Sequence, residues 1–191
     1  MHVMRLIGGA VLVLACAWTG AAQSGQCALK PAQLPAVRGL RIGMTAAEFK
    51  SLYPRLVVGP ADEFGQTRAQ FQGAQLALAE PAAFKGVDDL YVKMIDDRVV
   101  EFGLTYDQLP WRDLDQFVAT TSALLGLPGE WKGGENWRTL DCGRVQLRAA
   151  RSSWSPESMS PALSFKALDA EEVVAARVAK KRERQIESFK P

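Results

Sequence analysis

The sequence predicts an α+β domain made of two units, each a helix followed by antiparallel strands, with a further helix at the C-terminus. Three observations predict it. A capped helical segment begins at Thr45, alternating apolar residues form a hairpin over 87–107, and a second helical face over 114–125 precedes more alternating segments. Because sequential strands joined by short turns pair antiparallel, we expect one sheet with these helices on one face, and the two units as a possible tandem repeat.

The composition is that of a globular chain with an apolar core, since 48% of the 191 residues are hydrophobic and 23% are charged. The net charge of +2 gives no reason to expect nucleic acid as a partner. We expect five segments along the chain: a signal peptide at 1–22, an N-terminal segment at 23–36 held by a disulfide, a first α+β unit at 37–109, a second at 110–168, and a charged helix or tail at 169–191.

The N-terminus has the pattern of a secretory signal. A weakly positive start is followed by the apolar run LIGGAVLVLACAW and by the small residues of TGAAQS. The run is too short to span a bilayer, so we expect export with cleavage after Ala22. Lipoprotein processing is the alternative, because Val13 to Cys16 reads VLAC and Cys16 would then be the lipidated first residue. The expected location is periplasmic or secreted, possibly as an outer-membrane lipoprotein.

Cleavage of that signal would remove His2, the single histidine of the chain. Without histidine, Ser-His-Asp and Cys-His catalysis and histidine metal sites are excluded. Carboxylates remain, such as Glu101, Glu130 and Glu135, but their spacing singles out no acid pair. We therefore expect no enzymatic activity, no cofactor and no metal site, with a carboxylate-based hydrolase as the least favoured alternative.

Two cysteines remain in the predicted mature chain, Cys27 and Cys142. In an oxidising compartment such a pair is expected to form a disulfide. A redox pair is the weaker alternative, since reactive pairs usually have the short C-x-x-C spacing. The bond would tie the N-terminal segment to a late strand.

A capping box predicts the start of the first helix. Thr45 is followed three residues later by Glu48, and Met44 and Phe49 are placed to form a hydrophobic staple across the cap. Pro54 stops the helix. Every residue of this stretch has a structural role, so we expect a scaffold helix.

The remaining elements follow from periodicity and turn residues. We expect a strand at 67–72, a second strand at 74–79, and the hairpin over 87–107 with a turn at Asp96 and Asp97. The second helix has Pro110 in its first turn, with Asp113 and Asp115 near its N-terminal end, and it ends at Gly126. Further strands are expected at 135–141, 145–151 and 162–168. The last helix has Asp169 as its predicted cap. Its basic stretch KKRER at 180–184 is expected to be solvated, and contact with an anionic membrane surface or peptidoglycan is the alternative.

The stretch RIGMTAAEF at 41–49 resembles the opening of the SmpA/OmlA-type small outer-membrane lipoproteins of the barrel-assembly machinery. The ending LLGLP at 124–128 is similar to the helix exit of that family, and Trp137 stands where an aromatic strand residue would follow. The first helix departs from the pattern, because it ends in Leu-Tyr-Pro. Tandem copies of such a unit are similar to the β-lactamase inhibitor protein fold. The resemblance implies an envelope protein that binds other proteins without catalysis.

Tryptophan and arginine gather in the second unit. These residue types dominate the hot spots of protein interfaces, so a binding surface on the open face of the sheet is the functional hypothesis. Its candidate residues are Trp131, Trp137, Arg138, Arg148 and Trp154. Alternatively, the tryptophans fill the core and the arginines lie on a solvated strand face.

These observations together favour a protein-binding module. The expected partner is another envelope or secreted protein, with no nucleic acid and with membrane contact only through a possible lipid anchor. A secreted inhibitor or a small-ligand binder that uses the open sheet face is the alternative function.

Overall fold

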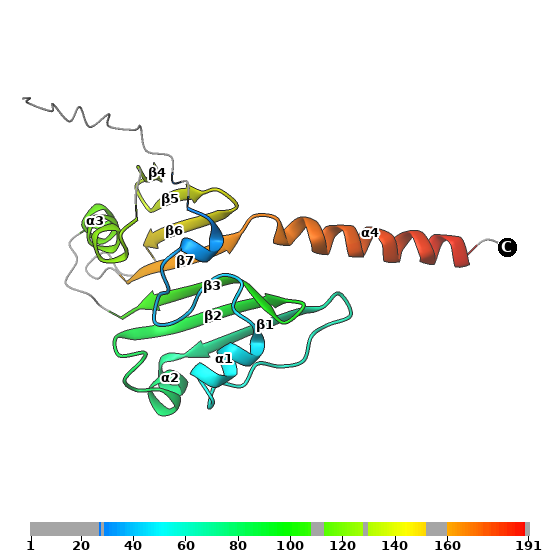
Figure 1. Cartoon of the computed structure of the whole chain (residues 1–191), viewed down its shortest axis with the longest axis horizontal. Coiled ribbons are helices and arrows are strands. Elements are labelled where there is room, and N and C mark those ends of the chain that lie inside the picture. The colour runs from blue at the N-terminus through cyan, green and yellow to red at the C-terminus, as the bar shows by residue number, and fades with distance from the viewer. Residues whose placement is uncertain (1–26, 28, 108–112, 128–129, 152–159, 190–191) are drawn as a thin grey trace, which may run out of the picture.

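One antiparallel sheet of seven strands, in the order β1-β2-β3-β7-β6-β5-β4, organises the fold (Figure 1). The computed structural model describes residues 27, 29–107, 113–127, 130–151 and 160–189. Within them the strands are β1 (Gln66–Gln72), β2 (Val87–Ile95), β3 (Arg98–Tyr106), β4 (Lys132–Gly134), β5 (Trp137–Cys142), β6 (Val145–Arg151) and β7 (Pro161–Ala167). The helices are a 3-10 turn at Pro31–Gln33 and α1 (Ala46–Leu52), α2 (Gly73–Ala79), α3 (Leu114–Leu125) and α4 (Ala170–Ser188). The predicted α+β class is confirmed.

Two antiparallel units meet at the centre of this sheet. The first consists of β1, β2 and β3 after α1, and the second of β4 to β7 after α3. Their last strands, β3 and β7, lie side by side with Phe102 opposite Phe165. The two rings stack with centroids 4.8 Å apart and planes 7° apart, and neither side chain is accessible to solvent. This pairing joins the two units into one sheet with one core.

Three helices cover one face of the sheet. Alternate strand residues point into that face and are almost fully buried, among them Leu90, Leu147 and Leu163. On α1, the ring of Phe49 stacks on Phe71 of β1. A similar aromatic contact joins α3 to β3, where Phe117 meets Tyr106 edge to face. Aromatic side chains therefore anchor both helices to the sheet.

The predicted capping box begins α1. The backbone N–H of Glu48 donates to Thr45 Oγ1 at 3.1 Å, and the Thr45 N–H donates to Glu48 Oε2 at 2.7 Å. The preceding backbone is also tied to β3, since the Gly43 N–H donates to the Val99 carbonyl at 2.7 Å and the Val99 N–H to the Met44 carbonyl at 2.8 Å. The cap thus positions α1 against the β2–β3 hairpin and serves as scaffold.

The strand predicted at 74–79 is wrong, because these residues form helix α2. The N–H of Gln72 donates to Gln75 Oε1 at 3.0 Å, which closes a capping box that the sequence reading missed. Leu76 and Ala79, three positions apart, are buried, whereas Leu78 is 80% exposed. Alanine favours helix over strand, and this preference outweighs the short apparent alternation.

The structure identifies the cap of α3 and corrects the predicted cap of α4. Asp113 caps α3, because its carboxylate accepts the Gln116 N–H at 2.7 Å, while Pro110 lies outside the described residues. Asp169 precedes α4 but makes no side-chain cap hydrogen bond. Its carboxylate instead pairs with Arg144 at 3.1 Å, because the β5–β6 turn brings that guanidinium close. A charged partner from another element has replaced the local contact.

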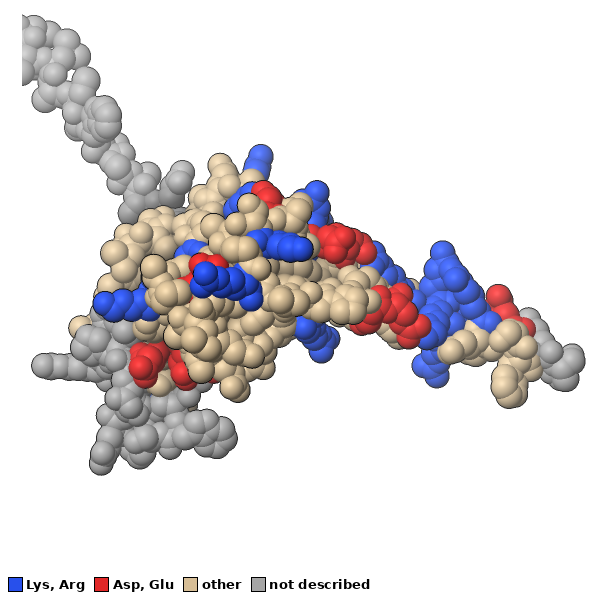
Figure 2. All heavy atoms as spheres, turned by 90° about the horizontal axis from the view of Figure 1, so that it is seen from below, with Lys and Arg blue, Asp and Glu red and all other residues tan. Residues whose placement is uncertain are grey.

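Helix α4 projects beyond the sheet and is held where it passes the body (Figures 1 and 2). Arg177 donates through Nη1 to the Phe64 carbonyl at 2.6 Å and to Asp96 Oδ1 at 2.9 Å, and through Nη2 to Asp96 Oδ2 at 2.5 Å. One turn later, Lys181 pairs with Glu63. These contacts join the helix to the β2–β3 turn and to the segment before β1.

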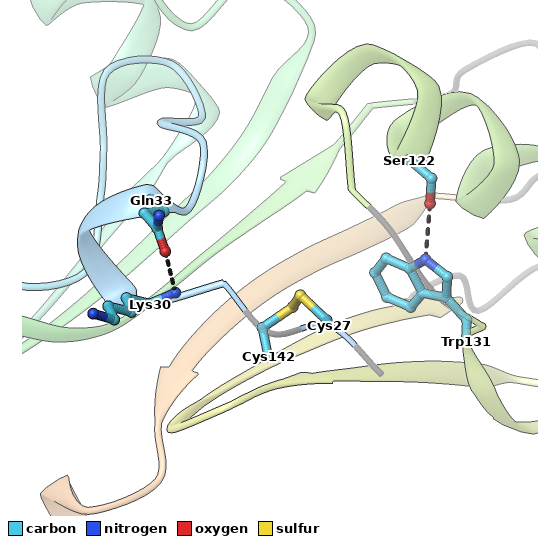
Figure 3. Close-up of a disulfide and its surroundings, with 6 residues drawn as sticks. All are labelled: Cys27, Lys30, Gln33, Ser122, Trp131 and Cys142. Atoms are coloured by element: carbon cyan, nitrogen blue, oxygen red, sulfur yellow. Dashed lines mark hydrogen bonds between the residues drawn. A yellow bond between two sulfur atoms is a disulfide. The ribbon is translucent and has the colours of Figure 1, made fainter. Parts of the chain in front are cut away.

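A disulfide joins Cys27 to Cys142, as predicted (Figure 3). Both cysteines are buried, and their Cα atoms lie 4.5 Å apart. The sequence separation is 115 residues, so the bond fixes the N-terminal segment to the end of β5. Such bonds persist in oxidising compartments, which is consistent with an exported protein.

Removal of this disulfide is expected to destabilise the fold strongly. For the 115-residue separation, the chain-entropy model predicts that Cys27→Ser/Cys142→Ser lowers the free energy of unfolding by about 4–5 kcal/mol. Urea denaturation monitored by tryptophan fluorescence measures the loss, and the reduced wild-type protein is the control that should match the variant. A loss below about 1 kcal/mol would mean that the N-terminal segment contributes little constraint to the unfolded chain.

The anchor of α4 is expected to depend on pH. Hydrogen bonds from Arg177 lower the pKa of Asp96 in the folded protein. A depressed carboxyl pKa gives a stabilising contribution that is present above the unfolded-state pKa and is lost as the pH falls through the folded one. Carbon-detected NMR titration should therefore find the Asp96 pKa below the ordinary aspartate value of about 3.9. In Arg177→Gln the pKa should return toward that value, and an unchanged pKa would show that the pair does not form in solution.

Candidate functional site

The side of the sheet opposite α1, α2 and α3 is the candidate site, and it is called the open face below. Of the described helices, only α4 reaches it, where Glu171 pairs with Lys166 at 2.5 Å. Along each strand, the side chains of the open face alternate with those that point into the core. One row of direct cross-strand partners runs over all seven strands: Gln70, Tyr91, Gly103, Ser164, Arg148, Thr139 and Lys132.

The middle of the open face has short side chains. Gly103 and Thr105 of β3 lie opposite Ser164 and Ala162 of β7. A Cβ atom on Gly103 would lie 3.3 Å from Ser164 Cβ, so a larger residue there would crowd β7. Longer side chains lie on both sides of it. Tyr91 of β2 is on one side, and Trp137 of β5 and Arg148 of β6 are on the other. The open face therefore offers a low centre between two taller flanks.

Trp137 and Arg148 form the taller flank on β5 and β6. The guanidinium carbon of Arg148 lies 5.9 Å from the centroid of the Trp137 ring, within the range of a cation–π contact. The indole is 41% exposed. Together with Thr139 and Gln146, the two side chains line a hollow of 340 Å³. An aromatic surface, a cation and two hydrogen-bonding groups are thus presented to solvent in one place.

The glycines of the WKGGENW stretch explain how this tryptophan is seated. A Cβ atom on Gly133 would lie 2.7 Å from Cε3 of the Trp137 ring and 2.3 Å from the Trp137 carbonyl oxygen. The backbone of Gly133 also has a φ of 152°, which favours glycine. These glycines let β4 pass close beside the indole.

The other predicted surface residues lie elsewhere. Trp131 is half-buried against the core, and its Nε1–H donates to Ser122 Oγ on α3 at 2.8 Å (Figure 3). Arg138 follows Trp137 directly, so it points to the opposite face, where it pairs with Asp115 of α3 at 2.7 Å. Trp154 lies outside the described residues. Of the five candidates, the structure brings Trp137 and Arg148 together on the open face.

The sequence reading missed several residues of the open face. Burial raises the pKa of Tyr91, and the nearby Glu101 raises it further. Burial likewise raises the pKa of Asp89, with Asp88 as the second cause. The signal was present in the hairpin, because Leu90, Val92 and Met94 were assigned to one face and Tyr91 must then point to the other. The pairing of β3 with β7, which adds Ser164, left no signal in the sequence.

Lys93 is the most buried charged residue of the open face, at 7% exposure. Within the described part of the chain its ammonium makes no hydrogen bond and no ion pair within 4.0 Å. Its charge does act at longer range, because the pKa of Glu171 is lowered chiefly by the hydrogen bond from Lys166 and to a smaller extent by Lys93. Burial of an unpaired ammonium costs free energy.

Comparison of the chain with protein-family models, with curated proteins and with solved structures finds no match. The resemblance of the segment 41–49 to outer-membrane lipoproteins therefore stays a prediction. Among the described residues, no helix is both long enough and apolar enough to cross a membrane.

Replacement of Lys93 by an apolar residue of similar length should stabilise the protein. Because Lys93 is almost fully buried and has no hydrogen-bond or ion-pair partner for its side chain among the described residues, Lys93→Met is expected to raise the free energy of unfolding by about 1–2 kcal/mol. Lys50→Met, at an exposed lysine of α1, is the matched control and should change stability by less than about 0.5 kcal/mol. Chemical denaturation measures both variants. A loss of stability in Lys93→Met would show that the ammonium has a favourable interaction across the open face.

Proposed function

We propose that the protein is an exported, non-catalytic binding module whose open face docks a partner protein of the envelope or the secreted space. The observation that carries the proposal is the Trp137–Arg148 pair, exposed beside the low centre of the open face. Tryptophan, tyrosine and arginine contribute most of the binding energy in protein interfaces. The open face has all three residue types, with Trp137 and Arg148 on one side of the short central residues and Tyr91 on the other.

Export is supported by two independent features. The N-terminal segment has the pattern of a secretory signal, with cleavage after Ala22 or lipidation of Cys16 as the two routes. The buried disulfide between Cys27 and Cys142 is a bond that reducing compartments disfavour. An extracytoplasmic location places the open face among other envelope or secreted proteins.

The positions of Asp89 and Glu101 on the open face favour binding over hydrolysis. Asp89 of β2 lies opposite Thr105 of β3, and Glu101 precedes Thr105 by four residues on the same strand. At about 3.3 Å per strand residue, their backbones are about 13 Å apart. Glycosidases hold their two carboxyl groups about 5 to 9.5 Å apart, so the backbone positions of Asp89 and Glu101 do not favour that chemistry.

Site-specific photocrosslinking in the cells that make the protein tests the proposal. Benzoylphenylalanine at Thr139 on the open face is expected to give a discrete protein adduct. The same probe at Leu124, which is 79% exposed on α3, is the matched control and should give none. Adding Trp137→Ala and Arg148→Ala to the Thr139 probe should reduce the adduct at least about tenfold, since hot-spot truncations cost about 2 kcal/mol or more.

Three outcomes are informative. An adduct of defined mass from Thr139 alone supports the binding surface, and mass spectrometry of the adduct identifies the partner. The same spectra give the mass of the unreacted protein, which shows whether it begins at Gln23 after signal cleavage or at an acylated Cys16. Equal adducts from both positions, or none from Thr139, would reject the open face as the docking site.

A further inference from the structure

A groove of 710 Å³ lies between α4 and the body of the protein, apart from the hollow beside Trp137 on the open face. The body side of this α4 groove consists of Glu63, Phe64, Gly65 and Asp96, and the helix side of Arg177, Lys180, Lys181 and Arg184. Figure 2 shows Lys and Arg side chains gathered along the projecting part of the helix.

The two walls of the α4 groove are held in fixed positions. Arg177 is fixed by three acceptors, the Phe64 carbonyl and both oxygens of Asp96. Gly65 has a φ of +74°, and a Cβ atom there would lie 2.6 Å from Asp96 Oδ1 and 2.7 Å from Arg177 Nη1. Lys181 pairs with Glu63 and lies 5.4 Å from the centroid of the Phe64 ring. Arg177 and Lys181 therefore hold α4 against the body, which sets the place of the helix turn that carries Lys180 and Arg184.

The charges of the α4 groove do not balance. Four cations at positions i, i+3, i+4 and i+7 share one helix face, and the body supplies two carboxylates. Those carboxylates pair with Arg177 and Lys181. Lys180 and Arg184 form no hydrogen bond or ion pair with any described residue. Lys180 and Arg184 lie four residues apart, so these like charges repel one another. Glu183 and Glu187 follow them by three residues each but form no ion pair with them, so both cations remain available to an added anion.

We propose that the α4 groove binds a phosphate-bearing anion, of the phosphate monoester or diphosphate class, through Lys180 and Arg184. A phosphate monoester carries about −1.5 to −2 charges at neutral pH, which suits the two cations of the groove that have no ion pair among the described residues. Its oxygens accept charge-assisted hydrogen bonds from ammonium and guanidinium groups. The groove exceeds the size of a single phosphate, so the rest of the ligand extends along Phe64. Soluble compounds and phosphate monoester lipids both present this group.

NMR titration of the purified full-length protein with inorganic pyrophosphate at low ionic strength tests the proposal. Saturable shifts are expected for the backbone amides of Gly65 and of residues 180–184. Lys180→Gln/Arg184→Gln should weaken binding at least about tenfold, because two charge-assisted hydrogen bonds are lost. The matched control is Arg182→Gln/Lys50→Gln, which removes the same charge from the far side of the helix and from α1. It should change the affinity by less than about twofold, because exposed distant charges are screened.

A further comparison distinguishes a soluble phosphate compound from a lipid headgroup as the ligand. Vesicles containing phosphatidic acid are compared with vesicles of phosphatidylcholine alone. Binding of pyrophosphate and of the phosphatidic acid vesicles supports a lipid headgroup, and binding of pyrophosphate alone supports a soluble ligand. Unchanged amide shifts outside the groove show that each variant is folded.

Two results would overturn the assignment. One is an equal loss of pyrophosphate binding in both double variants, which would indicate general charge attraction. The other is binding of hexaglutamate without pyrophosphate, which would assign the groove to an acidic protein segment. Trp137→Ala should leave pyrophosphate binding intact, so the α4 groove and the open face can fail independently.

Discussion

The pairing of β3 with β7 is the contact on which the rest of the structure depends. Each unit alone would leave one long strand edge unpaired and would lose the ring that covers Phe102 or Phe165. The stack of Phe102 on Phe165 and the backbone pairing around it turn two small sheets into one. The same pairing places Gly103 beside Ser164 on the other side, so a single junction creates both the continuous core and the low centre of the open face.

Strand alternation is the second constraint, and it decides which residues can act together. Trp137 and Arg138 are neighbours in the chain but point to opposite faces, so one joins the open face and the other holds α3 through Asp115. Trp131 likewise serves α3 through Ser122. A cluster of tryptophan and arginine in the sequence thus divides into a scaffold set and an exposed pair. Residue type alone could not make this division.

Electrostatics separates the open face from the α4 groove. On the open face, charges of both signs lie in one cross-strand row. The charged residues are Arg68, Lys93, Glu101, Lys166 and Asp141, with the neutral Gln146 between the last two, and the first turn of α4 adds Glu171. In the groove, cations outnumber carboxylates and lie on one face of α4. A mixed surface with an exposed indole suits a protein partner, whereas an excess of cations suits an anion. The molecule therefore has two surfaces with different recognition chemistry.

The sequence by itself determined the capping box at Thr45, the hairpin over 87–107, the end of α3 at Gly126, and the cysteine pair, because these depend on residues within a few positions or on the count of a rare residue type. It failed at 74–79, where a short apolar run fits both periodicities and the propensity of alanine decided for helix. It also failed at Asp169, where Arg144 from another turn took the carboxylate. Only the tertiary structure decided the β3–β7 pairing, the separation of Trp137 from Arg138 and the α4 groove. Each of these features joins residues that are distant in the chain or depends on which face of the sheet a side chain points to. Neither local propensity nor composition encodes such features.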